Sequence, residues 1–197
     1  MNRRISKVAV LGSGIMGSGI ACHFANIGVE VLLLDISPKD LNSNEKKNNL
    51  TLDNPKVKNR IVNEMFNKCI KSKPSPIYNK KFINRISLGN YDDNIHEIKN
   101  VDWIIEVVVE RLDIKKQIFD LIEKHRSNGT IVSSNTSGIP IKLMNEGRSI
   151  DFKKHFAITH FFNPPRYLNL FEVVPGPECE KEVLDFLLNY GEKFLGK

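Results

Sequence analysis

A glycine-rich turn between two apolar runs constrains this chain more than any other stretch of it. The run Val8–Leu11 leads into three glycines in the spacing G-x-G-x-x-G, namely Gly12, Gly14 and Gly17. Apolar residues then recur at steps of four, four and three, which is typical of a helix, at Met16, Ile20, Phe24 and Ile27. A second apolar run ends on Asp35. This order of strand, turn, helix, strand and acid predicts a dinucleotide-binding β-α-β unit over residues 4–36.

Each glycine has a physical reason in such a unit. Gly12 allows a tight turn out of the strand, Gly14 lets a pyrophosphate approach the backbone, and Gly17 lets the helix lie close to the strand. The pyrophosphate then meets unpaired N–H groups at the positive end of the helix dipole. A glycine turn that only packs is the alternative interpretation, but it leaves the acid unexplained. Asp35 can accept hydrogen bonds from a ribose 2′-hydroxyl and would repel a 2′-phosphate, which favours NAD over NADP.

Composition is that of an ordinary water-soluble protein. The 197 residues suffice for one domain, 1–197, with 41% hydrophobic and 26% charged side chains. No apolar run approaches the roughly 20 residues that span a bilayer. The basic start Met1–Arg4 precedes a run too short for a signal peptide. Three widely spaced cysteines show no metal-type spacing, so we expect reduced thiols, no metal and a cytoplasmic location.

The net charge of +6 has several interpretations. Nucleic-acid binding is one, a small polyanionic substrate is another, and solvated lysines in a Lys- and Asn-rich chain are a third. The basic residues do not cluster with aromatic ones, so we expect no nucleic-acid partner.

The remaining pattern alternates strands with helices. Residues 39–60 are predicted to be exposed, and residues 56–72 to form a helix that Pro74 and Pro76 end. Further strands are expected over 86–88, 101–109, 130–134, 155–162 and 170–174. Further helices are expected over 92–99, 114–128, after Pro140, and over 182–194. Such alternation predicts a Rossmann-type, doubly wound, mostly parallel sheet with an inserted helical excursion. Glu106 lies inside the buried run 101–109, either near an edge or satisfied by a partner.

Polar side chains gather where the predicted strands end, which is where ligands bind in such sheets. They are Asp35, Glu110, Asn135, Ser137 and His160, with Glu172 inside the following strand. A histidine with a carboxylate partner and a nearby hydroxyl suits proton transfer beside a hydride acceptor. A purely structural His160 is the alternative; the other four histidines are expected to be structural.

Four strings and one further residue carry a resemblance to a known family. They are Gly12-Ser-Gly-Ile-Met-Gly17 with Asp35, Glu106-Val-Val-Val-Glu110 with Lys115, Ser134-Asn-Thr-Ser137, His160-Phe-Phe-Asn-Pro164, and Glu172. Together they resemble the 3-hydroxyacyl-CoA dehydrogenase family, along the whole chain and most closely its bacterial fatty-acid-oxidation branch.

The resemblance implies a role for each matching residue. His160 would be the general base, Glu172 would orient its imidazole, and Ser137 would bind the substrate oxygen and touch the nicotinamide. Asn135 would help to hold the substrate. NAD would be contacted by Gly12, Gly14, Met16, Gly17, Asp35, Glu110, Lys115, Ser137 and Asn163.

The family's pattern also implies partners. The substrate would be an acyl-CoA, whose phosphates would meet part of the basic charge, with CoA near residues 56–73. The family continues into a helical domain that supplies an active-site asparagine and much of a homodimer contact, and the string that begins it is not among these 197 residues. We therefore expect the cofactor half of the enzyme, which binds NAD and turns over poorly. A non-catalytic NAD(H)-sensing module and another β-hydroxyacid dehydrogenase are the alternatives. The latter typically uses a lysine as its acid/base, and the string His160–Pro164 does not fit it.

Overall fold

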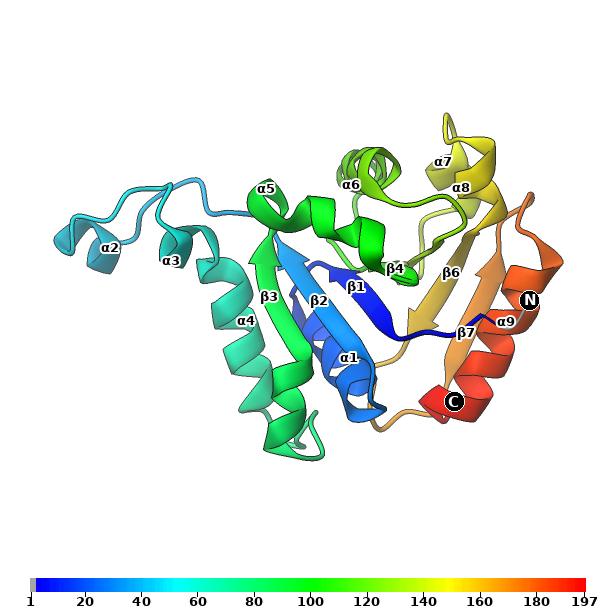
Figure 1. The fold of residues 1–197 in the computed structure, drawn as a ribbon, viewed down its shortest axis with the longest axis horizontal. Helices are drawn as coiled ribbons and strands as arrows, with labels where there is room; N and C mark the ends of the chain where they lie inside the picture. The colour runs from blue at the N-terminus through cyan, green and yellow to red at the C-terminus, as the bar shows by residue number, and fades with distance from the viewer. Residues whose placement is uncertain (1–2) are drawn as a thin grey trace.

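The computed structural model describes residues 3–197, and across them seven strands form one sheet in the order β3-β2-β1-β4-β5-β6-β7 (Figure 1). The strands are β1 Lys7–Leu11, β2 Glu30–Asp35, β3 Ile86–Asn90, β4 Trp103–Glu106, β5 Ile131–Ser134, β6 Phe156–Phe161 and β7 Phe171–Pro175. The first six pair in parallel and β7 runs antiparallel to β6. The expected doubly wound, mostly parallel sheet is confirmed.

Helices cover both faces of the sheet. The helical segments are α1 Ile15–Asn26, α2 Ser43–Lys47, α3 Pro55–Lys58, α4 Arg60–Ile70, η1 Lys80–Arg85, α5 Tyr91–Asn94, η2 Ile95–Asn100, α6 Leu112–His125, α7 Ile141–Asn145, α8 Ile150–Lys154, α9 Lys181–Tyr190 and the π-helical turn η3 Gly191–Leu195. On one face α1, α4 and α9 bury a core, and on the other α5, η2, α6, α7 and α8 bury a second. Alternate residues of β1 enter the two cores, so the strand is apolar on both sides.

The strand expected over 101–109 is shorter, and that part of the prediction is wrong. β4 ends at Glu106, because the chain then turns beside the glycine loop. The N–H of Val107 still donates to the Leu11 carbonyl, but the N–H of Val108 turns back to the Glu106 carboxylate. Val109 is consequently 61% exposed rather than buried. This early exit opens the carboxyl edge of the sheet.

The single helix expected over 56–72 is also wrong, since the chain forms α3 and α4 with a break at Asn59. Together with α2 they form the inserted excursion, in which α4 packs beside β3 while α2 and α3 stand out from the sheet (Figure 1). An ion pair at 2.8 Å between Arg60 of α4 and the buried Glu45 of α2 joins these two helices. Within residues 3–197, no helix has the length and apolar character needed to cross a membrane.

Candidate functional site

The glycine turn joins β1 to α1 in a conformation that side chains would obstruct. Gly12 has φ +107°, and a Cβ there would lie 2.6 Å from the Val107 carbonyl oxygen. A Cβ on Gly17 would lie 1.8 Å from the Gly12 oxygen. Gly14 is the N-cap residue of α1, and a Cβ there would by contrast meet nothing within 4 Å. The turn therefore leaves open space at the N-terminus of a 12-residue helix, which fits a diphosphate.

Asp35, the last residue of β2, lies against this turn. Its Oδ2 accepts hydrogen bonds from the N–H of Ser13 at 2.6 Å and from the Ser13 hydroxyl at 2.5 Å. Its Oδ1 accepts from the N–H of Ile36 at 2.7 Å. The carboxylate is thus fixed beside the glycine turn, where an adenosine ribose would lie. Met16, in the first turn of α1, is half-buried.

His160 and Glu172 face each other across the antiparallel pair of strands. They are direct register partners of β6 and β7, and Nδ1 of His160 lies 2.9 Å from Oε2 of Glu172. That hydrogen bond assigns the proton to Nδ1 and leaves Nε2 as the ring nitrogen that can accept. The His160 side chain is only 17% exposed, packed 4.3 Å from the Phe162 ring between centroids.

The turn after β5 is tied to β6 through Asn135. Its side-chain oxygen accepts the N–H of Phe161 at 2.8 Å, and its own N–H donates to the Glu106 carbonyl at 2.8 Å. These two bonds hold the turn that carries Ser137 next to the strand that carries His160. Sequence reasoning placed both residues at strand ends, and the strands concerned, β5 and β6, pair with each other in the sheet.

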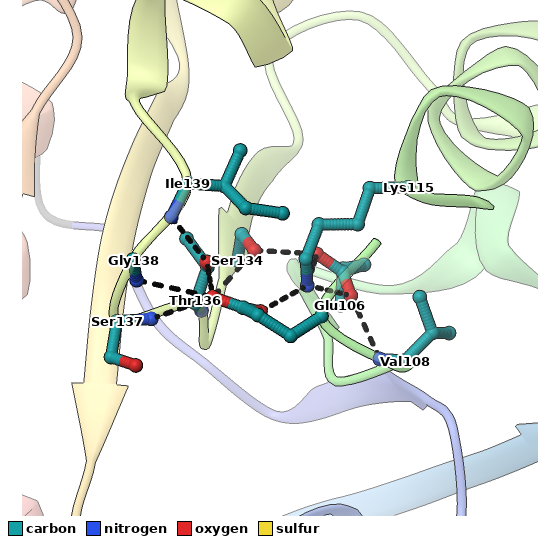
Figure 2. Close-up of polar contacts among 9 residues, drawn as sticks. Glu106, Val108, Lys115, Ser134, Thr136, Ser137, Gly138 and Ile139 are labelled. Atoms are coloured by element: carbon teal, nitrogen blue, oxygen red, sulfur yellow. Dashed lines mark hydrogen bonds and ion pairs between the residues drawn. The ribbon is translucent and has the colours of Figure 1, made fainter. Parts of the chain in front are cut away.

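A buried charge network lies beneath this turn (Figure 2). The Lys115 ammonium of α6 pairs with Glu106 Oε1 at 2.9 Å and with Glu110 Oε2 at 3.3 Å. Glu110 in turn accepts hydrogen bonds from the Thr136 hydroxyl and from the N–H groups of Ser137 and Gly138. The partner that the sequence left open for Glu106 is therefore Lys115.

Burial raises and pairing lowers the pKa of both Glu106 and Glu110, and a different effect prevails at each. Burial raises the pKa of Glu106, against the opposing effects of Lys115 and Ser134. Burial also raises the pKa of Glu110, but the bonds from Thr136 and Gly138 and the Lys115 charge outweigh it and hold that pKa below its usual value. Glu110 is thus held as an anion at the rim of the site.

The expected site residues differ in their access to a ligand. Gly14, Glu110, Ser137, Asn163 and Glu172 are exposed at the carboxyl edge, whereas Lys115 is 1% exposed. Direct contact of Lys115 with the cofactor stays a prediction. Sequence reasoning assigned no role to three polar residues that hold the edge together, Ser13, Ser134 and Thr136. The sequence feature that could have identified them is their position inside the strings Gly12–Gly17 and Ser134–Ser137.

The strand order, the glycine turn and the fixed acid define a dinucleotide-binding domain of the doubly wound class. The sequence model of one family, described as "3-hydroxyacyl-CoA dehydrogenase, NAD binding domain", matches residues 7–197. The chain belongs to the 3-hydroxyacyl-CoA dehydrogenase family, as an NAD-binding domain.

Individual relatives agree with this assignment. The chain is 53% identical over 197 residues to a probable 3-hydroxyacyl-CoA dehydrogenase of Bacillus subtilis, covering 100% of this chain and 25% of that protein. It is 39% identical over 197 residues to a putative fatty acid oxidation complex trifunctional enzyme of Rickettsia felis, again covering 100% and 25%. A solved 3-hydroxybutyryl-CoA dehydrogenase from Escherichia coli superposes with a TM-score of 0.69 at 28% identity, over 98% of this chain and 37% of that one. The chain thus spans a quarter of the length of these two curated relatives.

Proposed function

We propose that this chain is the cofactor-binding half of an enzyme that oxidises (S)-3-hydroxyacyl-CoA to 3-oxoacyl-CoA in fatty-acid β-oxidation. The observation that carries the proposal is the His160–Glu172 pair at the edge of an NAD-binding domain. A relative named as a fatty acid oxidation enzyme supports the substrate class.

His160 is the proton acceptor in this reaction. Its Nδ1–H is directed at Glu172, so Nε2 can take the proton of the 3-hydroxyl group. Glu172 orients the ring and stabilises the imidazolium that results. NAD, when bound, supplies the acceptor for the hydride that leaves C3.

Ser137 and its neighbours position the two ligands. The Ser137 hydroxyl lies on an exposed turn and hydrogen bonds the substrate oxygen, with Asn135 supporting the turn from below. Glu110 and Asn163 line the nicotinamide end of the cofactor. Met16 and the glycines hold its diphosphate, and Asp35 its adenosine ribose.

The test is His160→Gln in the full-length gene product, assayed for NADH oxidation with acetoacetyl-CoA. We expect kcat to fall at least about a thousandfold, because a positioned general base contributes a factor of that order, while the Kd for NADH changes less than about twofold. His96→Gln, on an exposed side chain, is the matched control and should retain activity.

Two outcomes would contradict the proposal in different ways. Normal turnover by His160→Gln removes His160 as the base. NADH binding without turnover of any acyl-CoA chain length by the unaltered protein indicates an NAD(H)-sensing module instead. A panel of 3-hydroxyacids with and without the CoA moiety separates this enzyme from other β-hydroxyacid dehydrogenases.

A further inference from the structure

Glu106 is a fully buried carboxylate to which the proposed function assigns no role. Its side chain is 0% exposed at the end of β4, and its ion-pair partner Lys115 is 1% exposed. Charged side chains are almost never buried so completely unless paired, and a buried pair is no net gain in stability over apolar residues of the same shape. The pair therefore calls for a reason other than stability.

The Glu106 carboxylate is saturated by donors from three segments. Oε1 accepts from the N–H of Val108 at 2.7 Å and from the Lys115 ammonium at 2.9 Å. Oε2 accepts from the Ser134 hydroxyl at 2.5 Å and from the same ammonium at 3.1 Å. Glu106 and Ser134 are also register partners of β4 and β5. One side chain thus fixes the ends of two strands and the first turn of α6 relative to each other (Figure 2).

Lys115 connects Glu106 to Glu110. Its ammonium, held by Glu106, lies 3.3 Å from Glu110 Oε2. The other Glu110 oxygen accepts the Thr136 hydroxyl and the N–H of Gly138 at 3.1 Å. Glu110 is 45% exposed, and within residues 3–197 the buried ammonium is the one partner of its carboxylate that lies outside the turn 136–138.

We propose that Glu106 is a positioning residue: through Lys115 and Glu110 it fixes the turn 136–138, and so sets the place of Ser137 beside the nicotinamide. The second half of this inference rests on the function proposed above. The first half concerns the chain alone and can be tested without any ligand.

Glu106→Gln tests the charge rather than the shape. The amide oxygen can still accept hydrogen bonds, but the side chain loses the negative charge that pairs with the ammonium and has a donor NH2 where the second oxygen stood. We expect the amides of Ser137 and Gly138 to exchange with solvent about tenfold faster by NMR, while core amides of β1 and β4 keep their rates. We also expect the Kd for NADH to rise about tenfold, measured by nicotinamide fluorescence on the 197-residue chain. A merely structural role would speed exchange throughout the sheet instead.

Glu123→Gln is the matched control. Glu123 also joins α6 to a neighbouring segment, accepting the N–H of Ser149 at 2.8 Å and Arg148 at 3.0 Å, at the other end of the helix. Its replacement should leave both the turn 136–138 and NADH binding unchanged.

The outcomes separate this inference from the proposed function. The positioning role is overturned if Glu106→Gln leaves amide exchange at 136–138 unchanged. It is also overturned if the unaltered chain binds NADH and the variant binds it equally well. Either result leaves the proposed function standing. If the unaltered chain fails to bind NADH while the variant's turn exchanges faster, the proposed function falls and the fixation of the turn stands. Should Glu106→Gln not fold, Thr136→Val removes the hydroxyl that Glu110 accepts and leaves the buried pair intact. It must then speed exchange at 137 and 138, and unchanged rates overturn the inference.

Discussion

Ser13 donates two hydrogen bonds to a single oxygen of Asp35, one from its backbone and one from its hydroxyl, at 2.6 and 2.5 Å. The first variable residue of the glycine turn thus holds the acid of the second strand. This fixes the carboxylate before any cofactor arrives, so its orientation costs nothing on binding.

Asp35→Asn should shift the cofactor preference. Removing the negative charge removes the repulsion of a 2′-phosphate, so the ratio of NADPH to NADH affinity should rise about tenfold. Fluorescence titration of the 197-residue chain with both nucleotides measures it. Asp53→Asn, on the exposed excursion, is the control and should leave the ratio as it was.

Replacement by alanine should lower the stability of the fold at Gly17 and the affinity for NADH at Gly14. Gly17→Ala places a Cβ 1.8 Å from a backbone oxygen and should lower the free energy of unfolding by about 3 kcal/mol. Gly14→Ala meets no protein atom within 4 Å and should change it by less than about 1 kcal/mol. Its Cβ enters the space for the diphosphate, so NADH affinity should fall instead. Urea unfolding and NADH titration of both variants decide this; equal stabilities would contradict it.

Glu172→Gln should lower kcat with little change in KM. Glu172 contacts the His160 ring, and in the proposed mechanism its loss removes the orientation of that ring and the charge stabilisation of the imidazolium, at about a hundredfold cost in kcat. Steady-state kinetics of the full-length gene product measure both parameters. Glu178→Gln, a surface partner of Lys153 beyond β7, should behave like the unaltered enzyme.

His23 should make stability depend on pH. The pKa of this α1 residue falls from 6.5 to about 4, mainly because the ring is buried and also because of the Lys197 charge, while the bond to the Leu195 carbonyl opposes the shift. The unfolded chain binds the proton near pH 6.5 and the folded chain only near 4. The free energy of unfolding should therefore be full above pH 6.5 and fall as the pH drops to 4, by at most about 3 kcal/mol.

Denaturant unfolding of His23→Gln between pH 4 and 7 measures the effect. The variant should show a flatter dependence over that window than the unaltered chain. His96→Gln, whose side chain is exposed, should retain the full slope. An equal slope in all three proteins would exclude His23 as its source.

The fold was predictable where local pattern and tertiary structure agree. The unit around Gly12 and Asp35 combines periodicity, turn chemistry and a strand-end acid within a few dozen residues, and the structure has each of them. β4 was overestimated because Val107 and Val109 read as buried strand. Their departure from the sheet depends on the glycine loop of β1, which no local pattern around them reports.

The sequence indicated candidate site residues, whose roles stay predictions, but not the contacts between them. Strand ends and the family resemblance pointed to His160, Glu172 and Ser137. The partner of Glu106 was not predictable, because Lys115 lies nine residues on and reaches it only through the turn between β4 and α6. Likewise the hydrogen bond of the Thr136 hydroxyl was not predictable, because it depends on the position of the Glu110 carboxylate in the fold.

The single reversed strand has a consequence for how this protein can tolerate change. His160 and Glu172 are register partners on adjacent antiparallel strands. Their contact therefore depends on the number of residues in the connection 162–170 and on the register of β7. A slip of β7 by one residue would turn Glu172 to the opposite face without altering any side chain. The length of that connection is therefore under the same constraint as the two residues themselves, although most of its side chains are exposed.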